Sequence, residues 1–324
     1  MISVIVPMFN AENTIIQALN GLETQTINEF EVVVVDDGST DNSSGLLSKF
    51  QNQSKLQIKL IKQSNAGPAK ARNAGVGQSV GNIIIFLDSD CVPPANWLEE
   101  MVRPLGGKIV GCNCGYKVKN KENLIARYID YEIAKRHENL KGKTVDTIGS
   151  YSASFFKDIF VKANGFSTEY TVASGEDFDL GFNIKKIGYD LFFTDRTFVY
   201  HYHPDSLRKY LKQQYGRGYW RVKLYLRNKK RILKGDSYTG HEAQIQFILS
   251  SLVLVSMPLV MINSIFLLSL VILLFSNISI GLWIYNKESK FILLGPILAS
   301  ARSLAGTIGA YSYIVKYLSS NSIR

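Results

Sequence analysis

Closely spaced acidic residues carry the clearest sign of chemistry in this sequence. Asp88 and Asp90 are separated by one serine and follow an apolar run. Two carboxylates at this spacing can share a hard cation, because Mg²⁺ and Mn²⁺ prefer oxygen ligands and leave room for substrate phosphates. Such triplets also occur in many turns, so the pattern is weak by itself. Placed after a buried strand, it predicts a divalent metal site (Mn²⁺ or Mg²⁺) formed by Asp88 and Asp90.

A second acidic string, residues 36–41, follows another apolar run. It has two interpretations. Asp36 and Asp37 either build a strand-end turn and a helix cap, or accept hydrogen bonds from a nucleoside. Gly67 opens a small-residue turn at a predicted helix start, where backbone N–H groups favour anions. Arg72, in that helix, is either a diphosphate ligand or a surface cation.

Glu176 and Asp177 begin a predicted helix, and His201 and His203 end a predicted strand. Acids are favoured at helix N-termini for electrostatic reasons alone, but a positioned carboxylate also serves as a general base. Residues two apart in a strand share a face, so both histidines are candidates for a metal or diphosphate contact. Ordinary packing is the alternative for each.

The elements that position these residues alternate along the chain. Apolar runs at residues 2–6, 30–35, 58–61 and 83–87 are separated by segments with helical spacing, and further strands are expected near 109–118 and 192–200. This order predicts an α/β fold with a mostly parallel sheet. Such sheets bind ligands beyond the carboxyl ends of their strands, where both acidic strings lie.

Together, these motifs resemble those of the family 2 glycosyltransferases, which have the GT-A fold. The resemblance covers roughly residues 1–200. It rests on Val4, Pro7, Phe9, Asn10, Glu12, the string 36–41, Asn65, Gly67, Ala71, Arg72, Asn73, Asp88, Asp90, Gly175, Glu176 and Asp177. It implies transfer of a sugar from a nucleoside diphosphate donor to an acceptor, with inversion at the anomeric carbon.

The resemblance also implies a role for each matching residue. Arg72 would meet the diphosphate and Asp88 the sugar or ribose. Asp90 would bind the metal together with His201. Asp177 would be the catalytic base, with Glu176 as a helper near the acceptor. The residues expected to frame the nucleotide are Pro7, Asn10, Glu12, Asp36, Asp37 and Gly67.

Charge is concentrated in one segment. The chain is 46% hydrophobic and 20% charged with a net charge of +10, which excludes a disordered chain. Residues 201–240 hold eleven Lys or Arg against two acids, a net charge of +9. Because this segment adjoins an apolar stretch, it predicts docking to anionic membrane lipids and no nucleic-acid partner.

The apolar stretch, residues 243–286, has no charged residue over 44 positions. As helix it would be roughly 66 Å long, about twice the apolar thickness of a bilayer. We expect spans at 245–262 and 265–285. A third apolar segment, 291–315, crosses, re-enters or lies against them. Lys287 and Lys290 predict a cytoplasmic catalytic domain. Arg302 interrupts the third segment and is a candidate ligand for a lipid phosphate.

Gln214, Arg217 and Trp220 resemble a motif of processive polysaccharide synthases, but the tryptophan comes two positions late and too few spans follow for a pore. A processive polymerase is therefore disfavoured. These three residues, with His203 and Arg302, are assigned to the acceptor and membrane side. A homo-oligomer is compatible with the sequence, which does not fix the oligomeric state.

The sequence thus predicts a GT-A catalytic domain (1–204), a basic interfacial helix region (205–242) and a transmembrane region (243–318). The expected activity is inverting transfer from a nucleoside diphosphate sugar to a lipid-linked acceptor at the cytoplasmic face of the membrane. Alternatives are a protein or polysaccharide acceptor, or a non-catalytic membrane adaptor. The adaptor is disfavoured because Asp88, Asp90 and Asp177 are all present.

Overall fold

The computed structural model describes residues 1–170 and 174–321, except for the side chains of Leu233 and His241. These residues form two compact units. The first consists of Met1–Lys119 and Leu140–Tyr202, and the second of Asn120–Asn139 and His203–Arg324. The segment Asn120–Asn139, which the sequence boundaries put in the catalytic domain, thus belongs to the second unit. The helix in this segment contacts aromatic and charged residues of the second unit, such as Phe291 and Arg302.

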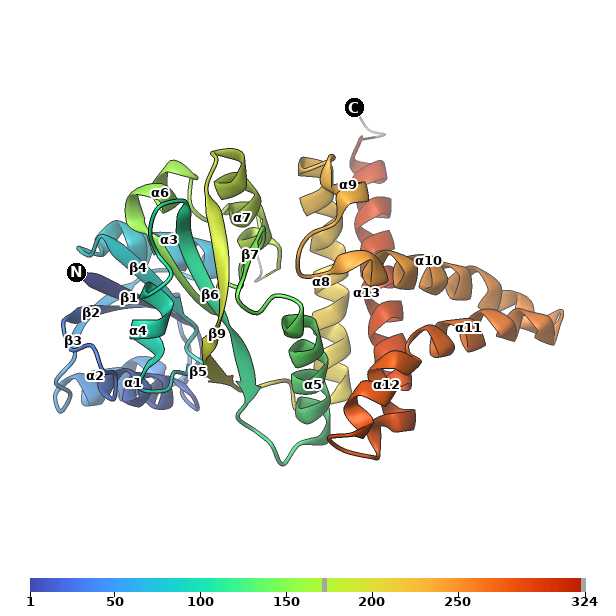
Figure 1. The fold of residues 1–324 in the computed structure, drawn as a ribbon, viewed down its shortest axis with the longest axis horizontal. Helices are drawn as coiled ribbons and strands as arrows, with labels where there is room; N and C mark the ends of the chain where they lie inside the picture. Colours follow the sequence, from blue (N-terminus) through green and yellow to red (C-terminus); the bar gives the residue numbers. More distant parts are fainter. Residues whose placement is uncertain (171–173, 322–324) are drawn as a thin grey trace. The chain divides into compact units, whose positions relative to one another are not determined.

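The first unit contains a nine-stranded sheet (Figure 1). Its strand order is β3-β2-β1-β4-β8-β6-β9-β5, and β7 also pairs with β9. The strands are β1 (Ile2–Met8), β2 (Phe30–Asp36), β3 (Gln57–Lys62), β4 (Ile83–Leu87), β5 (Cys91–Val92), β6 (Ile109–Val118), β7 (Lys143–Val145), β8 (Ser152–Phe156) and β9 (Asp190–His201).

The sheet is mixed but mostly parallel, which confirms the predicted class. β1, β2, β3 and β4 pair in parallel, as does β6 with β9, whereas β8 runs antiparallel between β4 and β6. β1 and β2 are buried along nearly their whole length. Their continuous apolar runs therefore reflect cover on both faces of the sheet.

Helices provide that cover. The core on one face includes α1 (Ile15–Glu23), α2 (Ser43–Gln51) and α4 (Trp97–Val102), with Trp97 fully buried. α3 (Pro68–Gln78) packs closely on β1 and β2, and its Gly75 faces Ile5. α6 (Lys157–Lys162) and α7 (Glu176–Lys186) complete the unit.

The second unit is helical. It consists of α5 (Leu124–Glu138), α8 (Leu207–Arg227), α9 (Arg231–Lys234), α10 (Gly240–Ser256), η1 (Met257–Met261), η2 (Ser264–Leu267), α11 (Leu268–Ser276), α12 (Ile278–Tyr285) and α13 (Phe291–Asn321). Within the part of the chain that the structure describes, three stretches are long and apolar enough to cross a membrane: Glu242–Met261, Ser264–Tyr285 and Phe291–Ser320. They coincide with the three apolar segments predicted from the sequence.

Two glycines of α3 make a matched pair for testing the helix–sheet contact. A Cβ on Gly75 would lie 2.4 Å from Ile5 Cγ2, whereas a Cβ on Gly77 would meet nothing within 4 Å. We expect Gly75→Ala to lower the free energy of unfolding by about 1–3 kcal/mol through overpacking. Gly77→Ala should raise it by up to about 1 kcal/mol, because alanine is the better helix former. Thermal unfolding of both variants measures this, and equal effects would contradict the packing.

Candidate active site at the carboxyl edge of the sheet

Asp90 and His201 are brought together by the short antiparallel pair of β5 and β9. In that pair Cys91 lies opposite His201, so Asp90 immediately precedes the paired position. Asp90 Oδ2 is 3.4 Å from His201 Nε2. Partial burial acts to raise the pKa of Asp90, but the charge and hydrogen bond of His201 outweigh it and the pKa is lowered. The carboxylate is therefore ionised and ready to accept a cation.

The donor atoms at this position suit a hard divalent ion. One ligand atom each from Asp90, Cys91 and His201 lies within 4.8 Å of the other two. Burial and the charge of Asp90 raise the pKa of Cys91 well above its usual value, so the sulfur stays a thiol and is a poor ligand. A carboxylate oxygen and an imidazole nitrogen remain, and substrate phosphates commonly complete such a set for Mn²⁺ or Mg²⁺.

Arg72 joins two carboxylates from distant parts of the chain. Its Nη2 is 2.6 Å from Asp88 Oδ1, and its Nη1 is 3.3 Å from Glu176 Oε1. The side chain is only 2% exposed. Burial acts to lower the pKa of Arg72, but Asp88 and Glu176 outweigh it and the pKa is raised. Arg72 is thus buried and paired, which excludes the surface-cation interpretation, and its contact with a diphosphate stays a prediction.

Glu176 and Asp177 occupy the first turn of α7 but differ in environment. Glu176 is buried and accepts the N–H of Ser174 at 2.7 Å. Asp177 is partly exposed, and its Oδ1 accepts from its neighbour's N–H at 2.9 Å. Burial, followed by the charge of Asp177, raises the pKa of Glu176 to about 7, although Arg72 opposes the shift. Asp177 is therefore the more accessible of the two carboxylates, and its role as the base stays a prediction.

The residues expected to frame a nucleotide organise the loops at the same edge. Asp37 accepts the N–H groups of Ala66 at 2.8 Å and Gly67 at 2.9 Å, which fixes the turn before α3. Asp36 Oδ1 accepts from Ser39 N at 2.9 Å. The described contacts thus show Asp36 and Asp37 in the turn-forming role. Contact of either residue with a nucleotide stays a prediction.

The loop after β1 is held in the same way. Pro7 is the penultimate residue of β1. Asn10 has a left-handed φ of 49° and accepts the N–H of Thr40 at 2.8 Å. Glu12 Oε2 accepts the N–H of Asn42 at 3.0 Å. The two loops that follow β1 and β2 are therefore tied together, as a shared ligand site at this edge would need.

Two tyrosines beside the candidate metal ligands were not found from the sequence. The rings of Tyr116 and Tyr151 stack with centroids 3.6 Å apart, and the Tyr116 ring lies 4.8 Å from that of His201. Asp88 N donates to Tyr151 O at 3.0 Å. No motif spacing marks these residues, because β6 and the segment before β8 bring them together only in the folded sheet.

The residues assigned to the acceptor side belong to the second unit. β9 ends at His201, so the predicted strand alternation does not extend to His203. His203 is buried, with Nε2 3.9 Å from Asp130 Oδ1. On α8, Gln214 is buried, Arg217 is exposed and Trp220 is partly buried.

Arg302 has polar neighbours inside the second unit. Its Nη1 is 2.6 Å from Glu132 Oε1, and it also donates to Gln246. Burial acts to raise the pKa of Glu132, but Arg136 and Arg302 outweigh it and the pKa is lowered. Arg302 is therefore not an isolated cation, and its predicted contact with a lipid phosphate stays a prediction.

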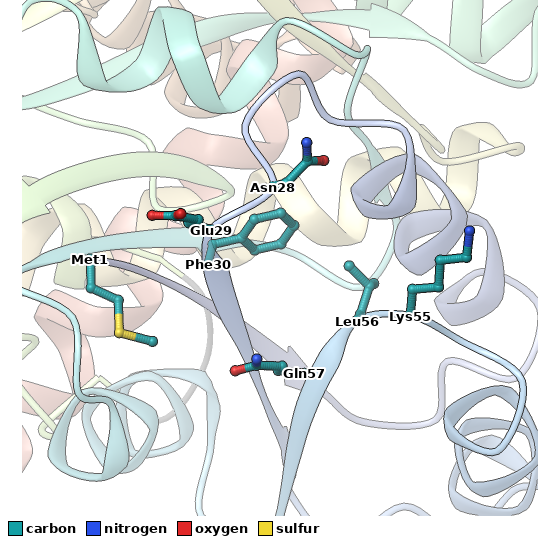
Figure 2. A pocket seen from close by; sticks show the side chains of 7 residues that line it. All are labelled: Met1, Asn28, Glu29, Phe30, Lys55, Leu56 and Gln57. Carbon is teal, nitrogen blue, oxygen red and sulfur yellow. The ribbon is translucent and has the colours of Figure 1, made fainter.

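A cavity of about 380 Å³ lies away from these residues (Figure 2). It is lined by Met1, Asn28, Glu29, Phe30, Lys55, Leu56 and Gln57. These residues sit at the amino ends of β1, β2 and β3, the opposite edge from the acidic cluster. Because parallel sheets bind ligands at the carboxyl edge, we take the acidic cluster as the functional site.

Two family models match the chain. Residues 3–162 match "Glycosyl transferase family 2", and residues 83–301, about two thirds of the chain, match "Glycosyl transferase family group 2". The chain belongs to the family 2 glycosyltransferases. Both models include Asp88 and Asp90, and the second also includes Glu176, Asp177 and His201.

Curated relatives of this glycosyltransferase match less than half of the chain. Glycosyltransferase AglE of Haloferax volcanii is 34% identical over 150 residues, which is 44% of this chain and 49% of that protein. Glycosyltransferase GlyA of Streptococcus pneumoniae is 40% identical over 120 residues, covering 37% of this chain and 16% of that protein. The chain thus spans about half or less of the length of these relatives.

Solved structures show that the fold is GT-A. Mannosyltransferase PcManGT from Pyrobaculum calidifontis, in complex with GDP-Man and Mn²⁺, matches with a TM-score of 0.66 and 17% identity over 97% of this chain and 86% of that one. GalNAc-T7, with UDP, GalNAc and Mn²⁺, matches with a TM-score of 0.52 and 16% identity over 63% and 43%. At these identities the likeness concerns the fold alone.

Removing the Arg72 guanidinium should lower the free energy of unfolding far more than removing a surface cation. At pH 8, where Glu176 is ionised, we expect Arg72→Ala to lower the free energy of unfolding by about 3–5 kcal/mol, because it leaves this carboxylate buried without its cation. The control removes a surface cation, Lys209→Ala, whose side chain is 67% exposed and pairs with the exposed Asp205. Its loss should change the free energy of unfolding only slightly, because exposed ion pairs contribute little to stability. Chemical unfolding followed by tryptophan fluorescence compares them, and equal losses would contradict a buried positioning role.

The raised pKa of Glu176 predicts a pH-dependent stability. The folded protein holds the Glu176 proton up to about pH 7, whereas the unfolded chain loses it near pH 4.5. Stability should therefore fall as pH rises through this window, by a few kcal/mol at most. Glu176→Gln lacks the titrating group, so its melting temperature should gain on that of the wild type between pH 5 and 8. Parallel pH profiles of the two melting temperatures would count against the raised pKa.

Proposed function

We propose that this protein transfers a sugar from a nucleoside diphosphate sugar to a lipid-linked acceptor, with inversion, at the cytoplasmic face of a membrane. The observation that carries the proposal is the bridge from Arg72 to Asp88 and Glu176. It holds the acidic residues expected on the donor side and those expected on the acceptor side in one rigid cluster.

On the donor side, Asp90 and His201 would hold a divalent metal. When bound, the metal neutralises charge on the leaving diphosphate. The structures of PcManGT and GalNAc-T7, which contain Mn²⁺, support this assignment by fold. Asp88, which pairs with Arg72, is proposed to orient the sugar or ribose. The loops held by Asn10, Asp36 and Asp37 are proposed to receive the nucleoside.

On the acceptor side, Asp177 is proposed as the base. It takes the proton of the acceptor hydroxyl as that oxygen attacks the anomeric carbon, and the bond from this carbon to the diphosphate oxygen breaks. Attack opposite the leaving group inverts the configuration. Glu176 is buried and paired with Arg72, so it is better suited to position the turn that carries Asp177 than to touch an acceptor.

The three apolar helices and the basic segment support a lipid-linked acceptor, such as a polyprenyl phosphate or a lipid-linked glycan. An enzyme held at a membrane surface meets such acceptors at high local concentration. His203, Gln214, Arg217 and Trp220 are proposed to serve this side. A lipid phosphate at Arg302 would have to compete with Glu132 and Gln246.

The test is an incubation of membranes containing the protein with a panel of labelled nucleotide sugars, with Mn²⁺, Mg²⁺ or a chelator, followed by lipid extraction. We expect label in the organic phase from at least one donor, and only when metal is present. Label that enters protein or aqueous polysaccharide would contradict the lipid acceptor. Absence of transfer from every donor would contradict the activity.

The variant arm uses two acids that each lie in the first turn of a helix. Asp177→Asn should lower turnover with a hydroxyl acceptor by about 10²–10⁴-fold, the usual contribution of a general base. Asp158→Asn, on the exposed first turn of α6, should leave turnover unchanged. Full activity of Asp177→Asn with a hydroxyl acceptor would exclude its assignment as the base.

A further inference from the structure

Helix α13 has the length and composition of a membrane span, but charged helices lie along one side of it. Near its start, Phe291 packs on Tyr128 of α5, with ring centroids 6.0 Å apart. One third of the way along, Arg302 pairs with Glu132 of α5 at 2.6 Å. Farther on, Tyr313 meets Tyr219 of α8 at a centroid distance of 4.9 Å. Contacts with α5 and α8 thus extend over more than twenty residues.

Helices α8 and α13 are in close backbone contact. A Cβ on Gly218 of α8 would lie 1.9 Å from the carbonyl oxygen of Gly306. A Cβ on Gly309 of α13 would lie 2.0 Å from the carbonyl oxygen of Tyr215. The two helices pack backbone to backbone through these glycines, so α8 must follow α13 wherever it lies.

Both neighbouring helices are too charged for the apolar core of a bilayer. α8 carries seven cations and no acid, and α5 carries three cations and three acids. If α13 crossed the membrane, it would carry many of these charges into hydrocarbon, where each is costly. The pairing of α13 with α5 and α8 is therefore hard to reconcile with a crossing.

The exposed side of α13 has the opposite character. Its exposed large apolar residues include Ile292 and Tyr317, and six others that share one side of the helix: Leu293, Ile297, Ile308, Tyr311, Val315 and Leu318. Their spacing follows the 3.6-residue period, so they form one stripe along the helix. A helix with an apolar stripe on one side and cationic neighbours beside it matches the profile of an interfacial helix, with the stripe in the acyl boundary and the cations at anionic headgroups.

The α10–α11 hairpin supplies the membrane-inserted element. It leaves the α8–α13 pair crosswise (Figure 1). Its tip is apolar, with Met261 92% and Ile262 79% exposed. At its base, Gln246 donates to Asn277 at 2.8 Å, and Asn277 donates to Ser300 of α13 at 3.1 Å. These hydrogen-bonded side chains join the base of the hairpin to α13. Polar groups at this position are suited to the interface between water and lipid.

We propose that α13 lies along the membrane surface together with α8 and does not cross the bilayer, whereas the α10–α11 hairpin enters the apolar core. The carboxyl end of α13 then lies on the same side of the membrane as the catalytic unit. The partner of the apolar stripe is the lipid surface itself. Arg302 then lies at the level of the lipid headgroups. Its pair with Glu132 thereby avoids the free-energy cost of placing charges at the centre of the bilayer.

The first test measures sidedness in the full-length protein. Ser320→Cys at the end of α13 and Lys49→Cys in α2 are both exposed positions, and the three native cysteines are buried. In sealed vesicles of one orientation, a membrane-impermeant maleimide should label both engineered cysteines from the same side. Labelling of Ser320→Cys only from the side opposite to Lys49→Cys would overturn the proposal.

The second test measures depth. Spin labels at Leu293, Ile297, Ile308 and Val315 in vesicles of anionic lipid should report nearly the same shallow depth from oxygen and nickel-complex relaxation. A spanning helix would give a depth that rises and then falls along this series. A label at Met261 should lie deeper than all four. Protection of the stripe from both reagents would mean a protein partner covers it and would also overturn the proposal.

Discussion

The buried guanidinium of Arg72 is the interaction on which the site depends. A cation that is 2% exposed needs polar partners, and it has one carboxyl group from the end of β4 and one from the start of α7. Asp88 follows Arg72 by 16 residues, whereas Glu176 lies 104 residues away. Their mutual neutralisation fixes the position of α7 against the sheet edge, and with it the orientation of Asp177.

A short antiparallel strand pair positions the candidate metal ligands. β5 is only two residues long, yet its pairing with β9 sets Asp90 beside His201 across more than a hundred residues of sequence. The Tyr116 ring, which stacks on Tyr151, lies 4.8 Å from the imidazole of His201. Backbone pairing thus provides the preorganisation, and the acidic side chains carry the chemistry.

The helical unit combines strongly charged helices with apolar ones. Close packing at glycines joins α8 to α13. Glu132 forms ion pairs with both Arg136 and Arg302 in one cluster. The apolar surface is then left on the hairpin and on one stripe of α13. Charge and apolar surface are segregated by packing rather than by sequence order alone.

Much of this could be predicted from the sequence. Continuous apolar runs predicted the buried parallel strands, the acidic strings marked the carboxyl edge, and 44 uncharged residues marked the apolar hairpin, because these signals are local in the chain. The tertiary structure alone decided that Arg72 is a buried bridge, that β9 ends at His201 so that His203 turns to Asp130, and that residues 120–139 join the helical unit. It also gave Arg302 its partner and α13 its charged neighbours. These features depend on contacts between residues distant in sequence, for which the spacing of residue types carries no signal.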